Sequence, residues 1–132
     1  MNHIRAVVTK IESMDNLTMV AFDTQNQFMQ MMSLGLNTNI SVGSVVTLGA
    51  KASNIALAKE FYGMISISNQ LNAIVKSVNN GELLSSIKIM IGDYQLESVV
   101  SLKSAKHMNL QVGDKVVALI KASELSILEV SE

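Results

Sequence analysis

The chain contains the stretch VGSVVTLGAKAS at residues 42–53, and it contains VGDKVVALIKAS at residues 112–123. The two stretches align at an offset of 70, and both end in Lys-Ala-Ser. A second pair of segments, NHIRAVV at residues 2–8 and NQLNAIV at residues 69–75, aligns at an offset of 67. Self-similarity of this kind is the sequence signature of a repeated structural unit. The protein is therefore predicted to be two copies of one small module.

The repeat limits the size of each unit. It divides the 132 residues into two units of roughly 65 residues each, near the lower limit for an independent core. The predicted boundaries are residues 1–60 for a first, degenerate module, 61–65 for a connector and 66–132 for the second module. No stretch is biased enough in Gly, Ser or charge to be a flexible linker. The two copies are therefore expected to pack together.

Composition excludes several classes of function. Hydrophobic residues make up 48% of the chain and charged residues only 16%, with a net charge of −1, which favours a homo-oligomer that covers apolar surface. The absence of cysteine excludes disulfides, thiolate metal sites and thiol catalysis, and the scarcity of aromatic residues disfavours binding of single-stranded nucleic acid. No apolar run approaches the ~20 residues that cross a bilayer, and the N-terminus lacks a signal-peptide core. The expected location is the cytoplasm.

Strand patterns dominate the second copy. Ile87, Ile89 and Ile91 alternate with polar or flexible residues, and Gly92-Asp93 then predicts a two-residue hairpin turn. Further strands are predicted over 71–78, 94–100, 115–121 and 126–130. Ser101 is predicted to cap a short helix between the third and fourth strands. Five strands with a helix after the third are typical of an OB-type barrel.

The first copy repeats this plan less clearly. Its predicted strands cover 4–11, 17–23, 28–32 and 45–50, with a helix over 34–39 and a connector over 58–64. The predicted fold class is all-β with short helices, arranged as two tandem OB-like five-stranded β-barrel modules.

One known family has the same motifs. The segment SISNQL at residues 66–71, followed by VGD at 112–114 and KAS at 121–123, resembles the Mop (TOBE-type) molybdate-binding domain. The whole chain is similar to the tandem, di-Mop form, the molbindins. The resemblance implies a non-catalytic protein that binds molybdate or tungstate at subunit interfaces, commonly as a trimer. It also implies no cofactor and no direct bond from protein to metal.

The sequence departs from the family pattern at two places. Ser68 stands where family members usually have arginine, which removes a fixed cation and its fork of donors. In the first copy, Asn2 follows Met1, so the serines before Asn69 have no counterpart there. Binding at each individual site is therefore a weaker expectation than the fold.

The residues at the repeat ends suit an oxyanion. A tetrahedral dianion offers only acceptors, so its site must supply hydroxyl, amide, ammonium and backbone N–H donors. The predicted oxyanion-binding residues are Ser66, Ser68, Asn69, Lys121, Ala122 and Ser123 in the second copy, and Asn2, Lys51, Ala52 and Ser53 in the first. Each set has a purely structural alternative, because Lys-Ala-Ser can form a solvated polar turn and residues 66–69 can be an ordinary approach to a strand.

Other candidate residues favour structural roles. The methionines of residues 29–32 could suggest Cu(I) ligands, but they fall in a predicted strand beside Phe28, which favours packing in the core or at an interface. His3 and His107 lack partners at metal-ligand spacing, and Asp93, Glu97 and Asp114 are expected in hairpins and turns. The glycines match neither a nucleotide-binding nor a hydrolase motif.

Two functions from different classes remain. The preferred one is a cytoplasmic molybdate or tungstate binder for storage or homeostasis, which holds the oxyanion between chains of a homo-oligomer. The family resemblance implies that this homo-oligomer is a trimer. The alternative is an OB-type module that has lost oxyanion binding and contacts a protein or nucleic acid. The net charge of −1 and the few aromatic residues speak against nucleic acid.

Overall fold

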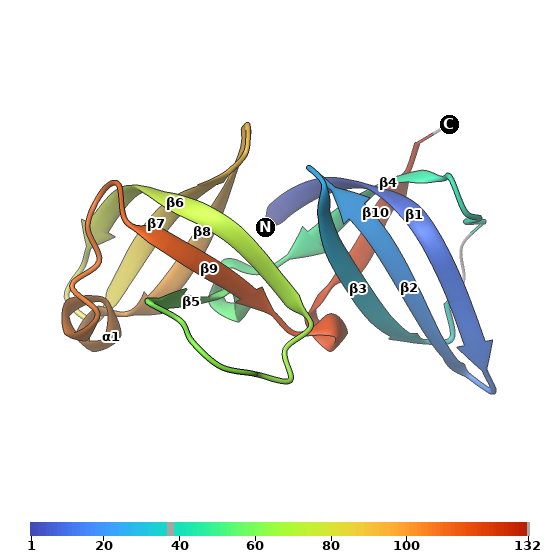
Figure 1. The fold of residues 1–132 in the computed structure, drawn as a ribbon, viewed down its shortest axis with the longest axis horizontal. Coiled ribbons are helices and arrows are strands. Elements are labelled where there is room, and N and C mark those ends of the chain that lie inside the picture. Colours follow the sequence, from blue (N-terminus) through green and yellow to red (C-terminus); the bar gives the residue numbers. More distant parts are fainter. Residues whose placement is uncertain (37–38, 132) are drawn as a thin grey trace.

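The computed structural model describes residues 1–36 and 39–131. Two five-stranded antiparallel sheets lie side by side along the long axis of the molecule (Figure 1). The first-copy strands are β1 (Asn2–Met14), β2 (Leu17–Thr24), β3 (Gln27–Leu34), β4 (Val45–Ala50) and β5 (Ala56–Lys59). The second-copy strands are β6 (Asn69–Asn80), β7 (Leu84–Ile91), β8 (Tyr94–Ser101), β9 (Lys115–Ile120) and β10 (Ser126–Val130). The predicted all-β class with two OB-like five-stranded units is confirmed.

The last strand of each copy is exchanged. The first sheet has the order β10-β4-β1-β2-β3, and the second has the order β5-β9-β6-β7-β8. After β4 and after β9, the chain makes a short 3-10 turn, η1 (Ala52–Asn54) or η2 (Ala122–Glu124), flanked by extended residues. No residue in either turn has a positive φ, so neither is one of the two-residue hairpin turns that return a strand directly to its neighbour. After each turn the chain enters the other sheet, where β5 pairs with β9 and β10 pairs with β4.

Alternation of buried and exposed residues forms each core. On β1, Ile4, Ala6 and Val8 are buried, whereas the residues between them are exposed. Such a period of two places one face of the strand against the core. In the second copy, β6 repeats this pattern, and Leu57 from the exchanged β5 joins the same core. The exchange therefore ties the two cores into one unit, and the expectation that the copies pack together is confirmed.

The turns and the helix follow local sequence. Gly92 has φ 60° in the β7–β8 turn, and Gln25 and Asn26 have positive φ in the β2–β3 turn. Helix α1 (Leu102–His107) begins after Ser101, whose side chain accepts a hydrogen bond from the Ser104 N–H, as predicted. The offset between the copies grows from 67 to 70 across this segment, so the second copy has three more residues in which to form the helix.

Two expectations for the first copy are wrong in detail. The helix predicted over 34–39 does not form in its described part: Leu34 ends β3, and Gly35 turns the chain with φ 68°. Residues 37 and 38 of that prediction lie outside the described residues. The connector predicted over 58–64 begins later, because Ala58 and Lys59 pair with β9 in the second sheet. The run between β5 and β6 has no regular structure over residues 61–68.

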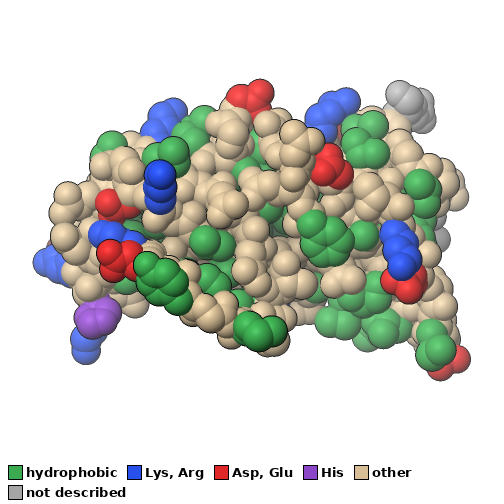
Figure 2. Space-filling model, in the orientation of Figure 1, with side chains coloured by type: hydrophobic (Ala, Val, Ile, Leu, Met, Phe, Trp, Pro, Cys, Tyr) green, Lys and Arg blue, Asp and Glu red, His purple; other side chains and the backbone are tan. Residues whose placement is uncertain are grey.

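Apolar side chains remain on the surface of the first copy. Figure 2 shows hydrophobic side chains gathered over the outer ends of β2 and β3. Phe28 is 56% exposed, Met32 40% and Leu34 78%, and all three side chains belong to the same face of β3, opposite the buried Met29 and Met31. Helix α1, the α-helix of the described residues, is much too short to cross a membrane.

Candidate functional site

The two Lys-Ala-Ser motifs form the same turn twice. Lys51 and Lys121 immediately follow β4 and β9, and each lysine precedes the 3-10 turn with extended φ and ψ angles. The carbonyl of Lys51 accepts a hydrogen bond from the Asn54 N–H at 2.9 Å, and that of Lys121 accepts one from the Glu124 N–H at 2.9 Å. These bonds hold each turn closed while its lysine side chain stays exposed.

The donors at these turns have no partners in the described part of the chain. The lysines and the serines Ser53 and Ser123 are exposed, and none of their side chains makes a hydrogen bond or an ion pair within residues 1–36 and 39–131. Ala52 and Ala122 are half-buried. A cationic side chain, a hydroxyl and the backbone N–H groups of one turn form a donor set that suits an anion.

The two turns are joined to each other. The side-chain amide of Asn54 donates to the Glu124 carboxylate at 2.9 Å, and these residues occupy equivalent places in the two copies. Turn η1 contacts β8 of the second copy, and η2 contacts β3 of the first. Sequence reasoning missed Glu124 as part of this region, although it directly follows Ser123. The region therefore contains the exposed Glu124 carboxylate, which accepts a hydrogen bond from Asn54, in addition to its exposed lysines.

Register places the serine segment beside the second turn. Asn69 pairs with Ile120, so the residues before Asn69 and the residues after Ile120 leave the same end of neighbouring strands. Ser66 is exposed and Ser68 is half-buried. Ser68 and Lys121, which directly adjoin these paired residues in the chain, thus lie at the same end of the second sheet. In the first copy Asn2 pairs with Ala50, which precedes Lys51 in the same way.

The two predicted asparagines bond to the opposite copy. The Asn69 amide accepts from the Gln30 N–H at 2.6 Å and donates to the Gln30 carbonyl at 2.9 Å. Asn2 makes the same pair of bonds with Glu97, at 2.7 and 2.8 Å. Asn69 is fully buried, with an exposed fraction of 0%. Its amide therefore contacts β3 rather than a space that solvent can reach.

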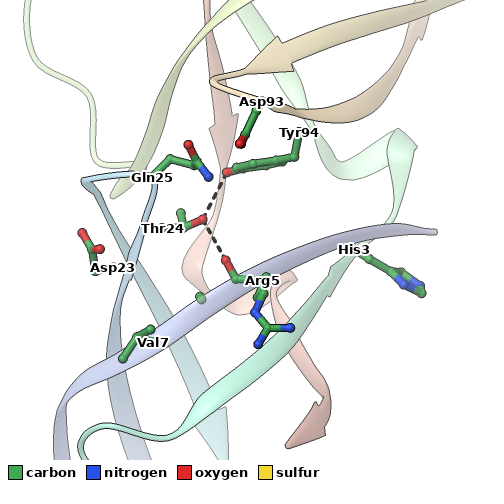
Figure 3. Close-up of a pocket in the computed structure, with 9 residues that line it drawn as sticks. His3, Arg5, Val7, Asp23, Thr24, Gln25, Asp93 and Tyr94 are labelled. Atoms are coloured by element: carbon green, nitrogen blue, oxygen red, sulfur yellow. Dashed lines mark hydrogen bonds between the residues drawn. The ribbon is translucent and has the colours of Figure 1, made fainter. Parts of the chain in front are cut away.

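A cavity lies at the seam between the copies. It has a volume of about 490 Å³ and is lined from the first copy and from the β7–β8 turn of the second (Figure 3). The Thr24 hydroxyl donates to the Arg5 carbonyl at 2.9 Å and lies 3.4 Å from the Tyr94 hydroxyl. Burial raises the pKa of Tyr94 above its ordinary 10.0, while the hydrogen bond with Thr24 lowers it and the charge of Asp93 raises it. The Arg5 and His3 side chains point away from this hydroxyl pair, so neither basic side chain of the lining faces it.

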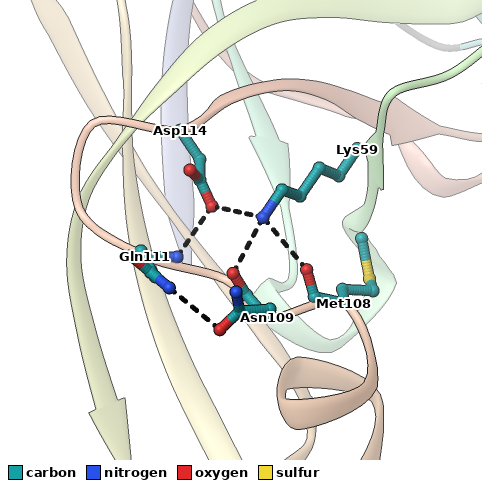
Figure 4. A network of polar contacts seen from close by, with 5 residues as sticks. All are labelled: Lys59, Met108, Asn109, Gln111 and Asp114. Atoms are coloured by element: carbon teal, nitrogen blue, oxygen red, sulfur yellow. Dashed lines mark hydrogen bonds and ion pairs between the residues drawn. The ribbon is translucent and has the colours of Figure 1, made fainter.

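An ion pair holds the exchanged strand β5 (Figure 4). The Lys59 ammonium lies 2.9 Å from the Asp114 carboxylate and donates to the carbonyls of Met108 and Asn109 at 3.1 and 2.8 Å. The hydrogen bond from Lys59 lowers the pKa of Asp114, and so does the backbone N–H of Gln111. Lys59 thus joins the first copy to the end of α1 in the second.

The remaining sequence candidates have structural positions. Met29 and Met31 are buried in the first core, so the predicted core packing of this strand is confirmed for these two methionines. His3 is exposed on β1, and His107 is exposed at the end of α1. Within the described ranges, no three His, Cys, Asp or Glu side chains are grouped closely enough to hold a metal ion.

Comparison with known proteins identifies the family. The family model for the TOBE domain matches residues 65–127. A curated relative, the "Probable molybdenum-pterin-binding protein" of Haemophilus influenzae, is 41% identical over 64 residues, which cover 48% of this chain and 93% of the relative. The chain therefore belongs to the Mop/TOBE-type domain family, in its tandem form.

Solved structures agree with this assignment. The cytoplasmic molybdate-binding protein ModG, in a crystal form with molybdate bound, superposes with a TM-score of 0.88 at 18% identity, covering 96% of this chain and 94% of ModG. A molybdate-binding protein from Sporomusa ovata superposes with a TM-score of 0.50 at 33% identity and covers 51% of this chain and 100% of its own. The first match shows that the tandem fold extends over nearly the whole chain. The second shows that a single copy corresponds to a complete smaller protein.

Proposed function

We propose that this protein binds molybdate or tungstate reversibly and serves as a cytoplasmic store of the oxyanion rather than as an enzyme. The observation that carries the proposal is the pair of Lys-Ala-Ser turns, each with an exposed, unpartnered lysine and serine in the described part of the chain. The names of the similar proteins, which describe binding of molybdate or of molybdenum-pterin, support this ligand class.

The proposed ligand contacts come from the turns and the serine segment. In the second copy they are Ser66, Ser68, Lys121, Ser123 and the N–H of Ala122. In the first copy they are Lys51, Ser53 and the N–H of Ala52. Hydrogen bonds to a charged ligand contribute about 1.5–3 kcal/mol each. A handful of them offsets desolvation and association costs to give affinity on the order of micromolar.

The proposed sites are completed by a second chain. Both turns are open to solvent in one chain, and a dianion held only on an exposed surface keeps most of its water. The exposed apolar residues of β3 and the small charged fraction also favour self-association. We therefore propose a homo-oligomer, a trimer, with the oxyanion at the interfaces between chains. A monomer by light scattering at micromolar concentration would contradict this part of the proposal.

Thermal unfolding with different oxyanions tests the function. A ligand present at 100 to 1,000 times its Kd stabilises the folded state by about 2.7–4.1 kcal/mol. Millimolar molybdate or tungstate is therefore expected to raise Tm by several degrees, whereas sulfate, a smaller dianion of the same shape and charge, raises it less. Equal effects of the three anions would indicate a general salt effect, and no effect of any would contradict the proposal.

A further inference from the structure

We propose that Asn2 and Asn69 are positioning residues, each of which fixes the edge strand of the opposite copy beside a Lys-Ala-Ser turn. This inference rests on the proposed function, and it assigns these two side chains to assembling the sites rather than to contacting the oxyanion. It also makes each site a joint product of both copies within one chain.

The geometry of the two asparagines is the same. Each amide accepts from a backbone N–H and donates to the carbonyl of the same residue, Gln30 for Asn69 and Glu97 for Asn2, at 2.6–2.9 Å. Gln30 and Glu97 lie at equivalent places in the edge strands β3 and β8, as their offset of 67 shows. The amide thus bonds to the edge strand as one more strand residue would.

This arrangement accounts for the residue type. An edge strand presents backbone N–H and C=O groups that lack hydrogen-bond partners. One side chain can bond to both groups of a residue only if it accepts one hydrogen bond and donates another. Aspartate can accept but cannot donate when ionised, and alanine does neither. The bond pair also occupies the middle of the β3 edge, so another strand cannot pair there.

The asparagines are linked to the turns through short connections. Asn69 directly follows Ser68 and pairs with Ile120, the residue before Lys121. The strand that its amide holds, β3, is the strand that contacts η2. Movement of β3 relative to β6 would therefore displace η2 from the serine segment. In the same way, the Asn2 bonds hold β8, which is the strand that contacts η1.

Molybdate titration of alanine variants tests the proposal. Asn69→Ala is expected to weaken molybdate binding at one class of sites at least about tenfold, the effect typical of losing a group that orients ligands. Asn2→Ala is expected to do the same at the other class, and because Asn2 is only half-buried, this variant remains informative if Asn69→Ala fails to fold. Amide hydrogen exchange gives a second measurement: protection of the Gln30 N–H should fall in Asn69→Ala and stay unchanged in Asn2→Ala.

A matched control separates positioning from general loss of stability. Ser85 is fully buried and donates to Asn80 at 2.7 Å, at the far end of the second copy. Ser85→Ala should lower Tm but leave the affinity for molybdate unchanged. The proposal is overturned if folded Asn69→Ala and Asn2→Ala bind molybdate like the wild type, or if Ser85→Ala weakens binding as much as they do. Failure of the wild type to bind molybdate would instead overturn the proposed function.

Discussion

Replacement of Lys121 by alanine tests the proposed second site at the lysine of its turn. The side chain is exposed and unpaired among the described residues, so its loss should change the free energy of unfolding by less than about 0.5 kcal/mol. In the complex, a charge-assisted hydrogen bond from its ammonium group to the dianion is worth about 1.5–3 kcal/mol. Because 1.4 kcal/mol is a factor of ten in affinity, Kd is expected to rise roughly 10- to 150-fold.

Calorimetric titration with molybdate measures this change directly. Lys51→Ala provides the parallel test in the first copy, and Lys103→Ala, which removes an exposed lysine from α1, is the control for net charge. Lys103→Ala should titrate like the wild type. Wild-type affinity in Lys121→Ala would rule out a ligand contact by this lysine. Equal weakening by Lys103→Ala would do so as well, because it would mean attraction by overall charge.

Three further predictions concern stability and titration. Gly49→Ala should destabilise the protein by about 1–3 kcal/mol, because a Cβ at this position would lie 2.7 Å from a side-chain atom of Leu128. Adding Leu128→Ala to this variant should restore stability, as measured by thermal unfolding. The pKa of Asp114 is lowered in the folded protein, chiefly by its hydrogen bond with Lys59. The pairing therefore stabilises the folded state above the unfolded carboxyl pKa of about 3.9, and this stability is lost as pH falls through the folded pKa. Asp114→Asn should flatten the acid limb of a stability–pH curve, and an unchanged limb would contradict this. The pKa of Tyr94 is raised in the folded protein, chiefly by burial. The stability that this shift contributes is present below the ordinary pKa of 10.0 and is lost as pH rises through the folded pKa. Tyr94→Phe should therefore remove the later phase of an ultraviolet alkaline titration.

The repeat made most of the fold predictable. The Ile87, Ile89 and Ile91 alternation, the Gly92-Asp93 turn and the Ser101 cap are local signals, and local physical chemistry determines the elements they predicted. The exchange of β5 and β10 was not predictable in this way, because a strand with the right alternation can pair with either sheet. One difference between the copies does bear on the exchange of β10. Gly49 in β4 leaves room for Leu128 of β10, whereas the equivalent residue in β9 is the larger Leu119.

The candidate site was predicted in part. Repetition of Lys-Ala-Ser pointed to the turns, and the structure places Lys51 and Lys121 in the same local geometry. The partner of Asn69 could not be read from the sequence, because Gln30 lies 39 residues away and is brought close only by packing of the copies. Glu124 was missed for the same reason, since its bond to Asn54 crosses between the copies.

Equilibrium dialysis against molybdate, with sulfate in excess, tests whether the two Lys-Ala-Ser turns bind the oxyanion when the wild type is compared with a Lys51→Ala, Lys121→Ala double variant. Molybdenum retained inside the dialysis bag is measured by elemental analysis, and both proteins are checked for equal Tm. The wild type is expected to retain molybdenum saturably in the presence of sulfate, and the double variant is expected to lose this retention. Equal molybdenum on both sides of the membrane for the wild type, or equal retention by the two proteins, would contradict it.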